Sequence, residues 1–220
     1  MTNPTVSNDA LMKLCAALLM VAAGLAVVGH LAVHPPGHQL IYQQEARWVW
    51  AHALSMWSFL FASVGCLGLY VHYLEKLGLT GLIATALTFV GLVFHAMSME
   101  YDAYAVPAIE AANNLGLTGP GGAAYGAPFL RAGSLMRGVI ELGGFSAFGL
   151  VIAMLGVSVP AGILVLLGTA LLAFQILGLG GPGVLAAVGL VIIQGAMGWL
   201  GWCMWRQTSQ AQVFKSARTE

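Results

Sequence analysis

The sequence predicts an all-α integral membrane protein, a bundle of six transmembrane helices with both termini in the cytoplasm. Of its 220 residues, 59% are hydrophobic and only 7% are charged, whereas an ordinary soluble domain carries about 25% charged residues. So few charges cannot cover the surface of a water-soluble fold of this size, so the long apolar segments are expected to face lipid. We expect a transmembrane domain at 10–206, preceded by a polar segment at 1–9 and followed by a polar tail at 207–220.

The first three spans are predicted from apolar runs that end at turn residues or at aromatic residues. The first, at about 10–34, is long enough to cross a hydrocarbon core of about 30 Å, and Pro35 follows it. The second runs from Trp48 to about Tyr73, with aromatic residues at both ends, as at the two surfaces of a bilayer. A short turn at 74–78 leads to the third span at about 79–99.

The longest connection, at 100–130, is expected to lie outside the membrane. The spacing of apolar residues at 102–114 predicts a short amphipathic helix on the membrane surface. The segment at 116–128 is rich in Gly and Pro and is predicted to be irregular. The last three spans are predicted at about 130–157, 161–177 and 184–205.

The charges indicate how the chain is oriented and what it contacts. One predicted side carries five basic residues and the other carries three: Lys13, Lys76, Arg206, Lys215 and Arg218, against Arg47, Arg131 and Arg137. The positive-inside rule then places both termini in the cytoplasm, with the chain crossing the membrane several times. Eight basic residues balance eight acidic ones, so no nucleic-acid surface is expected. The bilayer is the expected partner, and other membrane subunits or a homo-oligomer remain open.

Glycine is expected to hold the helices together. Lipid provides no hydrophobic drive for helix association, so small residues that let backbones approach closely must contribute. Many of the 29 glycines lie in the fourth and sixth spans, among them Gly143, Gly144, Gly198 and Gly201.

Three histidines lie at matching depths in three consecutive spans. His30, His52 and His95 each lie four or five residues inside the predicted outer end of their span, which is about 6–8 Å at the helical rise. His30 shares a helical face with Ala26, and His95 shares one with Gly91. Because small-residue faces turn toward neighbouring helices, these imidazoles are expected to face protein in the outer half of the membrane.

One hypothesis is that these histidines bind a redox cofactor, haem b. His52 and His95, on neighbouring antiparallel helices, are the candidate axial ligands, and Arg137 or Arg131 is the candidate partner of a propionate. Electron transfer is the activity that this arrangement suggests.

A second hypothesis is a transition-metal ion, Zn, Cu or Fe. His30, His52 and His95 are the candidate ligands, with Glu141 or Glu100 as a further ligand or a supporting carboxylate. Ionisable residues within a membrane are costly, which makes them candidates for a functional site.

Two other interpretations compete with a cofactor. In one, the protein is a non-catalytic membrane subunit or scaffold without a cofactor, and the histidines only pack between helices. In the other, an apolar small molecule is bound or transported, and enters between helices from the outer leaflet. The sequence leaves open whether the protein is an enzyme.

The second and third spans resemble a loose group of small bacterial polytopic membrane proteins. The similar residues are His52, Gly68-Leu69-Tyr70, Glu75, Gly78, Gly81, Tyr104 and Pro107. The resemblance implies an origin in a bacterial inner membrane, and it brings no activity, cofactor or site residue.

Overall fold

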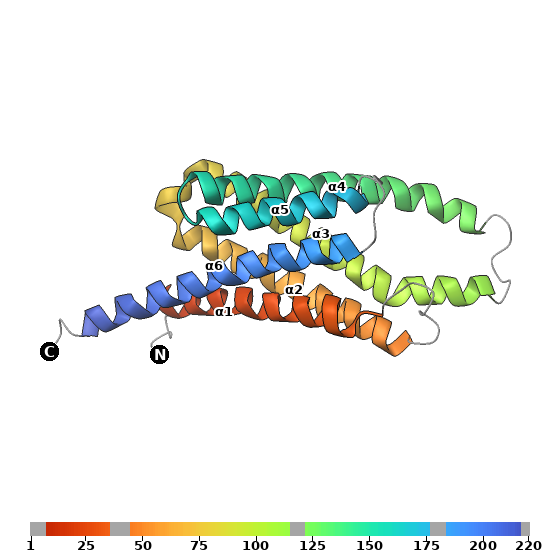
Figure 1. Cartoon of the computed structure of the whole chain (residues 1–220), viewed down its shortest axis with the longest axis horizontal. Coiled ribbons are helices and arrows are strands. Elements are labelled where there is room, and N and C mark those ends of the chain that lie inside the picture. Colours follow the sequence, from red (N-terminus) through yellow and green to blue (C-terminus); the bar gives the residue numbers. More distant parts are fainter. Residues whose placement is uncertain (1–7, 36–44, 115–121, 177–183, 217–220) are drawn as a thin grey trace, which may run out of the picture.

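A computed structural model describes residues 8–35, 45–114, 122–176 and 184–216 (Figure 1). The side chains at 106, 108–114, 122–137, 175–176 and 211–216 are outside this description. The predicted connections at 36–44, 116–121 and 178–183 also lie outside the described residues.

The described residues form six long helices and contain no strand, which confirms the all-α prediction. Each predicted span overlaps one of them: α1 (Asn8–Val27) continued by a π-helical segment, η1 (Val28–Val33), α2 (Glu45–His72), α3 (Leu74–Asn114), α4 (Gly122–Met154), α5 (Val159–Ile176) and α6 (Val184–Ser216). The helix α6 includes most of the predicted C-terminal tail.

The helices form a closed ring in chain order. Each helix packs against the next one, α6 packs back against α1, and α2 also contacts α6. Consecutive helices run antiparallel, so α1 begins and α6 ends at the same end of the bundle (Figure 1). At that end, Gly78 separates the first turn of α3 from the rest of the helix, with a φ of 52° that favours glycine. The helix is therefore interrupted at Gly78, within the turn that was predicted at 74–78.

Four helical segments are long and apolar enough to cross a membrane, which supports the prediction of a membrane protein. They are Asp9–Val33, Glu45–His72, Leu74–Ala105 and Val184–Gln210. The apolar stretches described in α4 and α5 are shorter, at Gly138–Met154 and Val159–Phe174.

The connection between the third and fourth spans differs from its prediction. Residues 102–114 do not form a separate surface helix but continue α3, and 122–128, predicted to be irregular, belong to α4. With 41 residues, α3 is about 60 Å long at 1.5 Å per residue. Its end and the start of α4 extend past the other helices (Figure 1). A continuous helix satisfies its backbone hydrogen bonds internally, whereas a turn onto the membrane surface would need new partners for them.

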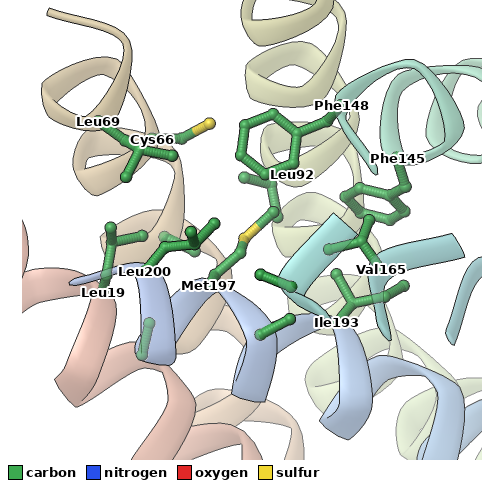
Figure 2. Packing of buried hydrophobic residues seen from close by; sticks show 14 of the residues in the cluster. Leu19, Cys66, Leu69, Leu92, Phe145, Phe148, Val165, Ile193, Met197 and Leu200 are labelled. Atoms are coloured by element: carbon green, nitrogen blue, oxygen red, sulfur yellow. The ribbon is translucent and has the colours of Figure 1, made fainter. Parts of the chain in front are cut away.

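The interior is apolar and closely packed. Figure 2 shows side chains from several helices meeting there: Leu92 from α3, Phe145 and Phe148 from α4, Val165 from α5, and Ile193, Met197 and Leu200 from α6. A Cβ atom at Gly144 would lie 2.7 Å from the carbonyl oxygen of Leu87, so this glycine permits close contact between α3 and α4. The packing role predicted for glycine is confirmed at Gly144, but a Cβ at Gly143 would meet nothing within 4 Å.

Candidate functional site

The π-helical segment η1 positions His30. It ends with a bond typical of a π-helix, in which the backbone N–H of His34 donates to the carbonyl of Gly29 over 3.0 Å. A Cβ at Gly29 would lie 2.8 Å from Oγ of Ser55, so η1 lies directly against α2. Single π-helical turns within longer helices occur often at functional sites, because the extra residue redirects the side chains around it.

His34 and His52 form an aromatic stack with Trp48. The ring centroids of Trp48 and His52 are 4.3 Å apart, those of His34 and His52 are 5.1 Å apart, and those of His34 and Trp48 are 5.2 Å apart. His34 was not among the predicted site residues. It lies four residues after His30, a spacing that could have linked the two from the sequence.

Backbone carbonyls fix this stack between α2 and α3. Nε1 of Trp48 donates to the carbonyl of Asp102 over 2.6 Å, which joins the two helices. Nδ1 of His52 lies 2.9 Å from the carbonyl oxygen of Trp48. Because a carbonyl can only accept, Nδ1 of His52 is the protonated ring nitrogen, and a neutral His52 has its lone pair on Nε2.

His95 and Glu141 form a buried pair between α3 and α4. Nδ1 of His95 lies 2.8 Å from Oε2 of Glu141, with exposed fractions of 3% and 0% for the two residues. An ionised Glu141 accepts a hydrogen bond from Nδ1–H, and Nε2 of His95 is buried without a hydrogen-bond partner among the described residues. A Cβ at Gly91 would lie 3.3 Å from Cα of Glu141, so the helices approach closely at this level.

Phe59 lies beside two of the three predicted histidines, His95 and His30. Its ring centroid is 4.2 Å from that of His95 and 6.5 Å from that of His30. His95, His34 and His52 are all close enough to His30 to interact with it electrostatically. Nε2 of His30, like that of His95, is buried and has no hydrogen-bond partner in the described part of the chain. The structure therefore brings His30, His52 and His95 to one region of the bundle, as their depths predicted.

The position of the other predicted site residues relative to this region stays a prediction. Glu100 is exposed on α3, and the side chains of Arg131 and Arg137 lie outside the described residues. Within the described residues, no group of three or more His, Cys, Asp or Glu side chains is arranged to hold a metal ion. His72 lies at the opposite end of α2, where its Nε2 is 2.9 Å from Oε1 of Gln207.

One buried polar residue was not predicted to matter. Gln194, on α6, is fully buried, and neither its Oε1 nor its Nε2 has a hydrogen-bond partner among the residues that the structure describes. It is the only charged or amide side chain in the predicted sixth span, and this isolation is the signal that could have identified it.

Comparison of the chain with protein-family models, with curated proteins and with solved structures found no match. A function is therefore inferred from the geometry of the histidines and their partners.

Proposed function

We propose that the protein is a multi-pass inner-membrane protein that binds a redox-active metal centre through Nε2 of His95 and of His52, and that it serves electron transfer. The centre is either the iron of haem b or a bare transition-metal ion, since both accept a lone pair from imidazole. The observation that carries the proposal is the state of His95. Its Nδ1 is hydrogen-bonded to Glu141, while its Nε2 is buried and has no hydrogen-bond partner in the part of the chain that the structure describes.

This arrangement is the one that metal-binding histidines adopt. A histidine that ligates a metal almost always donates its other ring N–H to a carboxylate or a carbonyl, which fixes the tautomer and makes the ligating nitrogen more basic. Glu141 would have that role for His95, and the carbonyl of Trp48 would have it for His52. A buried polar atom left without a partner costs about 1–3 kcal/mol. A metal on Nε2 of His95 would remove that cost.

The two forms of the centre make different demands on Phe59. A bare ion needs little room and could recruit His30, whose Nε2 is also unpartnered. A macrocycle between α2 and α3 would require the Phe59 ring to turn away from His95, since the ring centroids are now 4.2 Å apart. In the haem form, Arg131 or Arg137 would bind a propionate.

The proposed topology has six spans with both ends in the cytoplasm. Three basic residues lie toward one end of the bundle: Lys13 in α1, Lys76 near the start of α3 and Arg206 in the last part of α6. Arg47 lies near the start of α2, at the opposite end. This distribution favours a cytoplasmic location for the end where α1 begins, and the histidines would then lie in the outer half of the membrane.

The competing function is a scaffold in which the histidines only hold helices together. The bond from Trp48 to Asp102 and the stack on His52 would serve that purpose without a cofactor. Histidines that serve only in packing are expected to have both ring nitrogens satisfied, because buried polar atoms in native proteins nearly always have partners. Among the residues that the structure describes, the Nε2 atoms of His30 and His95 have no hydrogen-bond partner, which favours a ligand instead.

The test is to purify the protein in a mild detergent and measure its absorption spectrum, oxidised and reduced, together with its metal content. A Soret band that shifts on reduction supports haem, and stoichiometric Zn, Cu or Fe without such a band supports a bare ion. A folded, monodisperse protein that is colourless and free of metal would overturn the proposal.

A further inference from the structure

Gln194 lies on the face of α6 that packs against α1. Gly198 and Gly201 follow it by four and seven residues and therefore share its face. A Cβ at Gly201 would lie 2.7 Å from the carbonyl oxygen of Ala16, and one at Gly198 would lie 2.6 Å from Cβ of Ala23. Because the helices are antiparallel, the next turn places Gln194 opposite the end of α1, beside the start of η1. The structure has contacts between η1 and α6.

His30 lies on η1, which contacts α6, and it follows Ala23, the residue that Gly198 of α6 approaches, by seven residues. Side chains on a helix lean toward its N-terminus. Gln194 therefore leans toward the outer end of the bundle, and His30 leans toward the inner end, so that the two lean toward each other. Among the described residues, Nε2 of His30 and both amide atoms of Gln194 have no hydrogen-bond partner. An amide and an imidazole are complementary as donor and acceptor, and both remain unbonded.

Lipid makes these unbonded atoms costly, because the hydrocarbon region holds no water to replace a missing partner. Buried polar groups in native structures nearly always have one, and each exception needs an explanation such as a ligand or an ion. Gln194 is fully buried, and its neighbours Leu190, Ile193 and Met197 are apolar and buried too. These neighbours offer no hydrogen bond, and no described residue supplies one, so a bound molecule would provide the missing partner.

We propose that His30 and Gln194 bind the polar end of an uncharged, lipid-soluble molecule with oxygen atoms on a flat ring, the chemistry of quinones and quinols. The amide N–H of Gln194 suits a quinone carbonyl, and its Oε1 suits the hydroxyl of a quinol. The aromatic ring of Phe59, 6.5 Å from His30 by centroids, offers a flat apolar wall. A charged ligand is disfavoured, since an ion in this apolar interior would lose its hydration.

The role of this molecule as a redox substrate depends on the proposed metal centre at His95, whereas its binding does not. The Phe59 ring lies 6.5 Å from His30 and 4.2 Å from His95 by ring centroids, so the two sites adjoin. A molecule held by His30 and Gln194 would lie beside the metal centre and could exchange electrons with it.

The experiment titrates the purified protein with decylubiquinone and follows quenching of tryptophan fluorescence. Native protein should show saturable quenching. Gln194→Leu, a substitution of similar size, should weaken the affinity by about tenfold or more, since it removes the hydrogen bonds to the ligand. Without ligand, the same variant should unfold at a higher temperature, because it removes an amide that is buried without a partner.

Gln207→Leu is the matched control. Gln207 lies on the same helix, at the other end of the bundle, and accepts a hydrogen bond from Tyr73. It should leave the affinity unchanged.

The absence of saturable quenching in the native protein, or equal affinity in Gln194→Leu, would overturn the inference. Metal or haem content is measured on the same samples. A protein without a metal centre that binds quinone through Gln194 would contradict the proposed function alone, and a metal-loaded protein that binds no quinone would contradict this inference alone.

Discussion

His95 on α3 donates a hydrogen bond from Nδ1 to Oε2 of Glu141 on α4 across 2.8 Å, and both side chains are buried. The bond fixes which ring nitrogen carries the proton and where the imidazole points. It also places a carboxylate where it can raise the basicity of Nε2.

Replacing Glu141 with Gln should weaken the metal centre without removing it. The amide oxygen can still accept the proton of Nδ1, but it lacks the negative charge that makes the imidazole a stronger ligand. Loss of such a supporting partner lowers metal affinity by about 10–100-fold. The measurement is the metal or haem content after dialysis against a chelator or apomyoglobin. Full retention by Glu141→Gln would show that the carboxylate does not tune a ligand.

Replacing His52 or His95 with Ala should abolish retention of the centre, because each substitution removes a proposed ligand atom. His72→Ala is the control, since His72 lies on α2 at the opposite end of the bundle and is 2.9 Å from Gln207. The Soret absorbance or metal content is compared at equal protein concentration. Equal losses in all three variants would indicate general damage to packing rather than loss of a ligand.

Gly144→Ala should destabilise the bundle, and Gly143→Ala should not. A methyl group at Gly144 would be forced against the backbone of Leu87, 2.7 Å from its carbonyl oxygen, whereas one at Gly143 meets nothing within 4 Å. Overpacking of this kind costs about 1–3 kcal/mol, and Ala in place of Gly favours a helix by up to about 1 kcal/mol.

The unfolding midpoint of these two variants can be followed with a thiol-reactive dye. Cys15 and Cys66 are buried free cysteines that become reactive when the protein unfolds. A midpoint lowered by the same amount in both variants would contradict the contact described at Gly144.

Cysteines introduced at Glu75 and Glu100 should be labelled from opposite sides of the membrane. Both positions are exposed and lie near opposite ends of the apolar part of α3. In a variant without Cys15, Cys66 and Cys203, a membrane-impermeant maleimide added to intact spheroplasts should label position 100 and leave position 75 unlabelled. The reverse pattern would invert the proposed topology.

Hydropathy and spacing predicted the helices and the shared level of the histidines, because both depend on local chain geometry. The predicted depth of His30, His52 and His95 follows from the rise of a helix, and all three lie in one region. The partner helix of each side chain depends on contacts between distant segments. The sequence therefore did not reveal that Phe59 lies beside His95, or that Gln194 faces α1. The continuation of α3 through 102–114 was missed because an amphipathic pattern fits a surface helix and a helical extension equally well.

The π-helical segment η1 also makes the site sensitive to chain length. A π-helical turn holds one residue more than the α-helical bonding pattern requires. Deleting Val28 or Gly29 would let the segment adopt that pattern, and His30 would turn by about 100° around the helix axis. Related chains with one residue fewer in the first span would then keep all six helices and the other histidines, yet their His30 would point elsewhere. An insertion or a deletion would thus be enough to gain or lose this part of the site, without any substitution.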